Sequence, residues 1–310
     1  MIIEIKNLVK RYDELTALNH LNLVVEKGEI LGLLGPNGSG KSTSINCMLS
    51  LLSYDKGEIN LFGQPMRPDQ YEIKRKIGVV PQEIAVFDEL TVRENINYFC
   101  GLYIQDSALC KKYVEEAIQL VGLEDFTKFV PSKLSGGLKR RLNIACGIAH
   151  KPELIFLDEP TVAVDPQSRN KILESIRQLN QQGATIVYTT HYMEEVELLC
   201  NRIVIIDQGQ VIAEGTKESL KQMIGTNEKL VIEVPMLPAN AQQELNQIAG
   251  VADIFYDQIN LTISTTKLKE TLIATLDFFA KNDLHYGAIH TQEITLNDVF
   301  LEITGKELRD

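Results

Sequence analysis

The chain has 310 residues, of which 44% are hydrophobic, and it carries a formal net charge of −11. This length allows about two domains, and the negative charge argues against broad electrostatic binding of nucleic acid or anionic lipid. No run approaches the ~18 apolar residues that cross a bilayer, and the N-terminus carries no signal-peptide pattern, so we expect a cytoplasmic protein. Five scattered cysteines lack metal-ligand spacing and indicate reduced structural thiols.

The first informative motif lies between a predicted strand and a predicted helix. Apolar residues 30–34 predict a buried strand, and residues 42–49 predict the start of a helix. The intervening loop fits the phosphate-binding pattern Gly-x4-Gly-Lys-Ser/Thr, and a helix N-terminus attracts anions through its unpaired N–H groups and its dipole. We therefore expect a nucleoside triphosphate here, with Lys41 at the β and γ phosphates and Ser42 on Mg²⁺. The candidate nucleotide-binding residues of this loop are Gly35, Pro36, Asn37, Gly38, Ser39, Gly40, Lys41, Ser42 and Thr43.

A second glycine turn opens a predicted helix further along the chain. Its residues are Ser135, Gly136 and Gly137. Like the first loop, this helix N-terminus can hold a phosphate group, and the local sequence leaves open whether both face one nucleotide. A basic cluster follows directly, and its charges predict a solvated helix face rather than a nucleic-acid site. The cluster consists of Lys139, Arg140 and Arg141.

Two carboxylates follow the apolar strand predicted over residues 154–157. Asp158 and Glu159 would lie at the carboxyl end of this strand, where open α/β sheets bind their ligands. One carboxylate can hold the metal while its neighbour orients and polarises a water molecule against the γ-phosphate. We therefore expect Asp158 near Mg²⁺ and Glu159 near the attacking water. A further strand over residues 185–190 is followed by His191, which places this histidine at a strand end as well.

The pattern of elements changes near residue 225. Two short strands within 204–212 predict a hairpin that, with a helix over Lys217–Met223, completes a first domain of residues 1–224. Residues 225–229 predict a linker, and residues 225–310 predict a small accessory domain with thirteen acidic and six basic side chains. Its βαββαβ order is that of a ferredoxin-like α+β domain with a trailing helix. The predicted strands cover 230–234, 251–256, 260–264 and 284–290, and the predicted helices cover 240–249, 267–281 and 296–304.

These motifs, in this order, resemble the ATP-binding subunit of an ABC transporter over residues 1 to about 220. The resemblance implies an α/β P-loop NTPase domain with a helical signature subdomain, and ATP and Mg²⁺ as cofactors. It also assigns four further roles, which are adenine stacking for Tyr12, the Q-loop ligand of Mg²⁺ and water for Gln82, the D-loop carboxylate for Asp165 and the switch histidine for His191. In this family two ATP-binding domains meet head to tail. Ser135, Gly136 and Gly137 would then clamp the γ-phosphate of ATP held by Lys41 of the other subunit.

Two positions depart from the commonest family pattern. The signature ends in Leu138 where glutamine is usual, and the D-loop has Ala163 where glycine is common. Neither change removes a phosphate ligand. An apolar residue at position 138, the closing segment 295–302 and the accessory domain all resemble the drug-exporter and ABC-2 export branch.

The resemblance implies an exporter ATPase subunit that hydrolyses ATP to ADP and phosphate. It would work as a homodimer, peripheral on the inner face of a membrane, with a separate transmembrane permease. The segment 83–103 after Gln82 resembles the family region that receives the permease, and its candidate groove residues are Ile84, Val86, Phe87 and Leu90.

Several alternatives stay open at this point. The main one is a soluble ABC ATPase acting on ribosomes or nucleic acid, which the single phosphate loop, the lack of heptads and the acidic tail disfavour. The accessory domain could also be a small-molecule sensor. The exported substrate could be a lipid, a drug, a polysaccharide or an ion.

Overall fold

The computed structural model describes residues 1–223, 228–238, 240–292 and 295–305. The chain divides into two units, the first covering Met1–Thr216 and the second covering the described residues of Lys217–Glu307. No helix among these described residues is long and apolar enough to cross a membrane. Each unit has its own buried core, so each is described separately.

The central sheet of the first unit has the strand order β10-β9-β3-β8-β7-β6. Its strands are parallel except for β10, which pairs antiparallel with β9. Because both faces of a parallel sheet are covered, its strands are continuous apolar runs, and every residue of β3 is buried. The strands are β3 (Ile30–Leu34), β6 (Ile77–Val80), β7 (Leu154–Asp158), β8 (Thr185–Thr189), β9 (Arg202–Asp207) and β10 (Gln210–Gly215).

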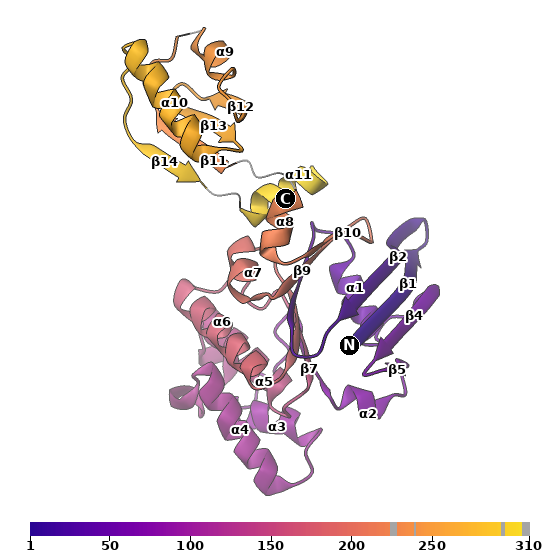
Figure 1. Cartoon of the computed structure of the whole chain (residues 1–310). Helices are drawn as coiled ribbons and strands as arrows, with labels where there is room; N and C mark the ends of the chain where they lie inside the picture. Colours follow the sequence, from indigo (N-terminus) through magenta and orange to yellow (C-terminus); the bar gives the residue numbers. More distant parts are fainter. Residues whose placement is uncertain (224–227, 239, 293–294, 306–310) are drawn as a thin grey trace. The chain divides into compact units, whose positions relative to one another are not determined.

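An antiparallel sheet covers helix α1 on one side of the central sheet (Figure 1). Its order is β2-β1-β4-β5, and its apolar side chains share one buried core with α1 and the central sheet, in which Ile3 and Phe156 are fully enclosed. This core holds β3 and α1, the strand and helix on either side of the loop at residues 35–40. The elements on this side are β1 (Ile3–Tyr12), β2 (Leu15–Val25), α1 (Lys41–Met48), β4 (Lys56–Leu61), β5 (Gln64–Pro65) and α2 (Tyr71–Lys74).

Helices cover the opposite face of the central sheet (Figure 1). Apolar faces of α3, α4, α5 and α6 pack on one another and on β7 and β8 in a second buried core. Helices α3, α4 and α5 form the helical subdomain that the resemblance implied, and the mainly parallel sheet covered on both faces has the expected α/β architecture. The helices are α3 (Val92–Gly101), α4 (Ser107–Val121), α5 (Gly136–Ile148), α6 (Pro166–Gln181) and α7 (Met193–Leu199), with short 3₁₀ turns at Glu124–Phe126 and Pro131–Lys133.

The predicted hairpin near residue 208 is present as β9 and β10. Gln208 and Gly209 form its two-residue turn with φ of 47° and 75°. Two positive φ values are typical of the type I′ turn, whose twist matches that of the strands it joins. The first unit ends just after β10, at Thr216.

The second unit contains a four-stranded antiparallel sheet in the order β12-β13-β11-β14. Helix α10 packs on β11, and the enclosed core between helices and sheet includes Ile232, Ile263 and Phe279. The βαββαβ order matches the expectation, while the name ferredoxin-like stays a prediction. The elements are α8 (Lys217–Met223), β11 (Glu228–Glu233), α9 (Ala241–Leu245), β12 (Val251–Tyr256), β13 (Asn260–Thr265), α10 (Leu268–Lys281), β14 (Ile289–Gln292) and α11 (Leu296–Thr304).

Three boundaries in this part of the chain differ from those expected. Helix α8 belongs to the second unit because it packs against α11, so the division falls after Thr216 and not after residue 224. The last strand begins at Ile289 and not at 284, because the N–H of Leu284 bonds to the carbonyl oxygen of Phe279 and closes the end of α10. Helix α9 is shorter than 240–249, and most of the predicted linker 225–229 lies outside the described residues.

A buried histidine in the first unit predicts acid sensitivity. The Nε2 of His150 lies 3.0 Å from the Ile77 carbonyl oxygen, its ring stacks on Tyr103, and Nδ1 is buried without a partner. Burial lowers the pKa of His150, although the bond to Ile77 opposes this shift. An added proton on Nδ1 would have no acceptor, so protonation is favoured in the unfolded chain.

We expect the stability contributed by His150 to be complete above its unfolded pKa of about 6.5 and to be lost as pH falls below it. Urea unfolding midpoints between pH 7.5 and 5.5 should therefore decline less steeply in His150→Phe, which keeps an aromatic ring for stacking on Tyr103. The exposed His285→Gln in the second unit serves as the control. An unchanged slope in His150→Phe would assign the acid sensitivity to other groups.

Candidate nucleotide-binding and hydrolysis site

The glycine-rich loop joins β3 to α1 under tight steric limits. A Cβ atom on Gly35 would lie 2.2 Å from the Ile206 carbonyl oxygen, and one on Gly40 would lie 2.7 Å from the Ala17 carbonyl oxygen. Gly40 also has φ of 107°, which side chains rarely adopt, and it caps α1 without any side-chain hydrogen bond. The first N–H groups of α1 therefore face the loop's interior with no side-chain cap, as an anion site requires.

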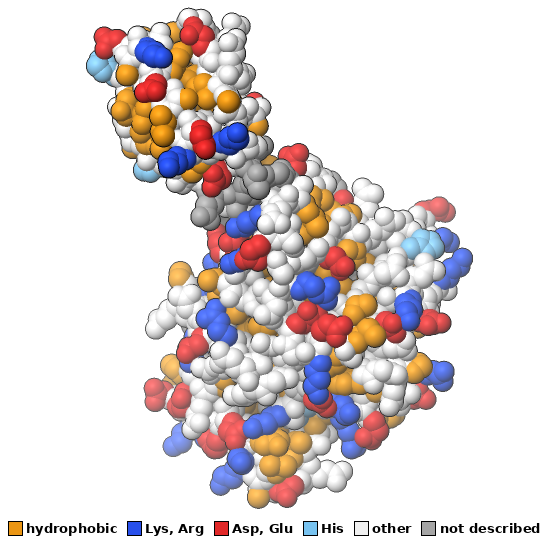
Figure 2. All heavy atoms as spheres, in the orientation of Figure 1, with side chains coloured by type: hydrophobic (Ala, Val, Ile, Leu, Met, Phe, Trp, Pro, Cys, Tyr) orange, Lys and Arg blue, Asp and Glu red, His pale blue; other side chains and the backbone are white. Residues whose placement is uncertain are grey.

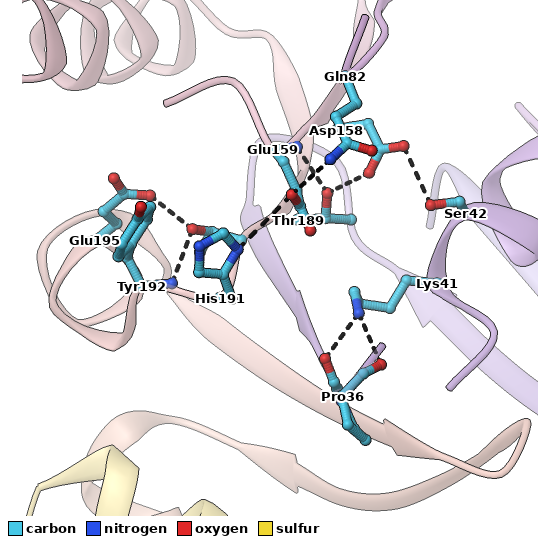
Figure 3. Close-up of polar contacts among 12 residues, drawn as sticks. Pro36, Lys41, Ser42, Gln82, Asp158, Glu159, Thr189, His191, Tyr192 and Glu195 are labelled. Carbon is cyan, nitrogen blue, oxygen red and sulfur yellow. Dashed lines mark hydrogen bonds and ion pairs between the residues drawn. The ribbon is translucent and has the colours of Figure 1, made fainter. Parts of the chain in front are cut away.

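Lys41 lies buried at the start of α1 and bends back over the loop (Figure 3). Its Nζ donates to the carbonyl oxygens of Gly35 at 2.7 Å and Pro36 at 3.1 Å. Burial lowers the pKa of Lys41, while the nearby charges of Glu159 and Asp158 oppose that shift. Among the described residues Nζ has only neutral carbonyl partners, so a phosphate group would supply the missing negative charge.

Asp158 is oriented by two hydroxyl groups at the carboxyl end of β7. The Ser42 hydroxyl donates to its Oδ2 at 3.2 Å, and the Thr189 hydroxyl donates to its Oδ1 at 2.6 Å (Figure 3). The Asp158 carboxylate therefore faces Ser42, the residue directly after Lys41. Hydroxyl and carboxylate oxygens are the ligands that Mg²⁺ prefers, so Ser42 and Asp158 fit a site for this ion next to the phosphates.

Glu159 lies between Gln82 and His191. The Gln82 side-chain amide donates to Glu159 Oε2 at 3.0 Å, and His191 Nδ1 lies 3.7 Å from the same oxygen. Glu159 has φ of 46°, an uncommon value for a residue other than glycine, and its backbone N–H bonds to the Thr189 hydroxyl at 3.0 Å. This backbone geometry turns the carboxylate toward the cavity and away from the strand axis. Gln82 presents its amide nitrogen to Glu159, so a role on Mg²⁺ needs its carbonyl oxygen to turn.

Lys41, Ser42, Gln82, Glu159 and His191 line one cavity of about 800 Å³. Asp158 is not part of this lining and contacts it through the Ser42 hydroxyl. Tyr12 is half-exposed at its edge, with Lys10 Nζ 5.1 Å from the ring centroid. Such an exposed ring can stack on a flat base, so the predicted role of Tyr12 fits its location. The lining residues are Tyr12, Leu15, Ala17, Asn37, Gly38, Ser39, Gly40, Lys41, Ser42, Thr43, Gln82, Glu159, Val162, His191 and Tyr192.

The second predicted anion site and the D-loop carboxylate lie outside this lining. The Ser135 hydroxyl accepts from the backbone N–H of Leu138 at 3.3 Å and caps α5, while Asp165 accepts from that of Ser168 at 2.9 Å and caps α6. A Cβ atom on Gly137 would lie 2.3 Å from the Ser168 hydroxyl oxygen, so the two helix starts pack closely. Within one chain, Ser135, Gly136, Gly137 and Asp165 form a separate group.

The departure at Ala163 has a conformational cost. Ala163 has φ of 57°, in the left-handed region where glycine carries no steric penalty. The usual glycine at this position therefore suits the backbone better than alanine does. Two residues further along the D-loop, Asp165 caps the helix that follows.

The basic cluster differs from the solvated helix face that the sequence predicted. Arg140 is only 6% exposed and donates to the carbonyl oxygens of Pro81 at 3.3 Å and Gln82 at 2.7 Å. Asn143, one turn further along α5, accepts from the Ala85 N–H at 3.0 Å. Helix α5 thus fixes the backbone around Gln82, a role that charge patterning alone does not reveal.

One cavity holds the phosphate loop, the strand-end Glu159 and the flanking glutamine and histidine, and Asp158 contacts it through the Ser42 hydroxyl. This arrangement defines a nucleoside triphosphatase site of the P-loop class. A family model described as ABC transporter matches residues 18–162. Two solved structures are similar to this chain. One is a dimeric ATP-binding cassette in a post-hydrolysis state bound to ADP and Pi, with a TM-score of 0.64 and 30% identity over 69% of this chain and 98% of that one. The other is cbiO1 of Clostridium perfringens, part of the transporter complex cbiONQ, with a TM-score of 0.66 and 26% identity over 72% and 91% of the two chains.

Relatives of known function match nearly the whole chain. The linearmycin resistance ATP-binding protein LnrL of Bacillus subtilis is 39% identical over all of both chains. The Nod factor export ATP-binding protein I of Burkholderia lata is 36% identical, covering 99% of this chain and 98% of its own. The daunorubicin resistance ATP-binding protein DrrA3 of Streptomyces coeruleorubidus is 33% identical over 97% and 95%. The chain therefore belongs to the ATP-binding proteins of ABC transporters, in the export branch that its signature resembles, and is an ATPase.

Proposed function

We propose that this chain powers export as one half of a head-to-tail homodimer bound to a separate transmembrane permease on the inner face of the membrane. One observation carries the proposal. The chain has two glycine turns that open helices, and only the one at α1 lines the cavity with Lys41. In a head-to-tail pair, Ser135 of one subunit could complete the site that contains Lys41 of the other. The dimeric state of the similar cassette with ADP and Pi supports this arrangement.

Hydrolysis would then use the residues that surround the γ-phosphate position. Glu159 orients the attacking water, and His191 and Gln82 hold the Glu159 carboxylate in place. Ser42 and Asp158 would hold Mg²⁺, which would balance phosphate charge. ATP binding favours the closed dimer and hydrolysis favours the open one. Two nucleotide states thus become two permease conformations.

A rigid aromatic surface next to Gln82 suits contact with the permease. Phe87 and Ile84 are exposed, and the Phe87 ring packs edge-on against Tyr98 with centroids 4.9 Å apart. The Asn95 side chain fixes the backbone of this segment by accepting from the Phe87 N–H at 2.8 Å and donating to its carbonyl oxygen at 3.0 Å. Exposed aromatic side chains on a fixed backbone are typical of interface anchors.

Export is the direction that the relatives support, since their names describe antibiotic resistance and Nod factor export. The rival function on ribosomes or nucleic acid finds no support in these names. On the face drawn in Figure 2, acidic and basic side chains are interspersed over the first unit and form no broad basic surface. Nucleic-acid binding would need such a surface.

Phe87→Asp should release the protein from the membrane fraction of cells that make its permease, because a buried charge at the interface costs more than the lost ring contact. We expect the bound fraction to fall about tenfold or more, a typical effect for an interface anchor. Cell fractionation with quantitative immunoblotting measures it. The control is Tyr71→Asp on α2, a more exposed aromatic away from this surface. Equal membrane binding by both variants would contradict the proposed surface.

A further inference from the structure

The turn that carries His191 is built on a buried carboxylate. Glu195, on α7, is fully buried four residues after His191. Its Oε2 accepts from the hydroxyl groups of Tyr188 at 2.6 Å and Thr190 at 2.8 Å. The Thr190 hydroxyl oxygen also accepts from the Tyr192 N–H at 3.0 Å, so the residues on both sides of His191 are tied to Glu195 (Figure 3).

An arginine from a different helix completes this network. Arg169, on α6, donates from Nε to Glu195 Oε1 at 2.7 Å. Its guanidinium also lies 4.7 Å from the centroid of the Tyr192 ring, and that ring lies 4.2 Å from the His191 ring. The imidazole of His191 therefore contacts the Tyr192 ring, which also contacts the Arg169 guanidinium. These ring contacts restrict the rotamers that His191 can adopt.

Arg169 lies in the first turn of α6, the helix that directly follows the D-loop. Its backbone N–H bonds to the carbonyl oxygen of Asp165, the residue that caps α6. A fully buried carboxylate with a charged partner is costly to desolvate, and a well-packed apolar pair could serve stability equally well. The arrangement is better explained by orientation, because Glu195 joins Tyr188 at the end of β8 and Thr190 next to His191 to a helix that Asp165 caps.

We propose that Glu195 and Arg169 are positioning residues for ATP hydrolysis, which hold His191 toward Glu159 and couple its turn to the helix that follows the D-loop. The inference rests on the proposed role of His191. It predicts that disturbing the Glu195–Arg169 pair slows turnover while ATP binding, which uses Lys41 and the loop, is unchanged.

The test compares steady-state hydrolysis and ATP affinity in Glu195→Gln, His191→Ala and the double variant of the intact chain. Glu195→Gln keeps the shape of the side chain but removes its charge, and kcat should fall roughly 10- to 100-fold with little change in the Kd for ATP, the scale for a misplaced catalytic group. The double variant should be no slower than His191→Ala alone, because residues that act as a unit are not additive. A purely structural role would instead lower the melting temperature and leave kcat of the folded protein at the wild-type value, which would overturn the proposal.

Two further variants keep the test decisive if Glu195→Gln folds poorly. Arg169→Lys keeps a positive charge beside Glu195 and should retain more activity than Arg169→Gln. Arg177→Gln is the matched control, because Arg177 lies on the same helix and donates to the Leu198 carbonyl oxygen at 3.0 Å, away from His191. Equal loss of kcat in Arg169→Gln and Arg177→Gln would refute a specific positioning role. Wild-type turnover in His191→Ala would instead refute the proposed role of the histidine itself.

Discussion

Lys41→Ala should lose tight ATP binding, with affinity at least ~100-fold weaker, the scale of about 3 kcal/mol for hydrogen bonds to charged phosphates. In the structure the Lys41 ammonium is already desolvated and held over the loop by the carbonyl oxygens of Gly35 and Pro36. The protein therefore incurs the cost of burying this charge before ATP arrives. The charges of Glu159 and Asp158 offset part of that cost, and the nucleotide phosphates would offset more of it.

Isothermal titration calorimetry measures this loss, and a melting curve of the variant verifies folding. The matched control is Lys74→Ala, since Lys74 also donates to a backbone carbonyl oxygen, that of Pro68 at 2.7 Å, but lies outside the cavity lining. Normal ATP affinity in a folded Lys41→Ala protein would refute the assignment of the phosphate loop.

Glu159→Gln should bind ATP normally but hydrolyse it at least ~100-fold more slowly, as expected for loss of a general base or water-orienting group. The amide keeps the size of the side chain but cannot accept a proton from water. It also changes the partner of the Gln82 amide, which donates to Glu159 Oε2. Because turnover stalls after ATP binding, the variant should accumulate as an ATP-bound dimer.

A phosphate-release assay measures the rate of hydrolysis, and size-exclusion chromatography with Mg-ATP detects the dimer. Glu153→Gln is the control. Glu153 directly precedes β7, at the opposite end of the strand from Asp158, and the Glu153 side chain pairs with Lys27 on the surface. If Glu159→Gln turned over ATP near the wild-type rate and stayed monomeric with ATP, another group would have to be the catalytic carboxylate.

The spacing of residues within short motifs was sufficient to locate the parts of the candidate site whose residues are close together in the sequence. The loop around Lys41 and the pair Asp158 and Glu159 lie where a strand meets a helix or a sheet edge, and the hydrophobic pattern locates such junctions. Contacts between distant segments were not predictable in this way. The burial of Arg140 against Gln82 and of Glu195 against Arg169 depends on how helices face one another, which charge patterns do not encode.

The predicted boundaries failed for a related reason. Helix α8 was assigned to the first domain because it follows the hairpin in sequence, yet its buried Leu220 lies on a helix that packs against α11, from the far end of the second unit. The end of α10 matches the prediction, but β14 begins later than predicted. The backbone bond at Leu284, which closes the end of α10, leaves no mark in the hydrophobic pattern. The order of the family motifs predicted roles for five further residues. Tyr12, Gln82 and His191 lie in the cavity lining, while Ser135 and Asp165 lie outside it and cap helices.

The claim that each site is shared between two subunits is tested most directly by mixing two inactive variants. Ser135→Arg fills the space for the partner's γ-phosphate, and Lys41→Ala removes the loop cation, so each variant alone should lack activity. In a mixed head-to-tail dimer, one site combines the intact Lys41 and the intact Ser135, while the other site carries both lesions. With equal mixing, half of the dimers are mixed, so ATPase activity should recover to about a quarter of the wild-type value. Hydrolysis at the wild-type rate by the Ser135→Arg protein alone would contradict the shared site.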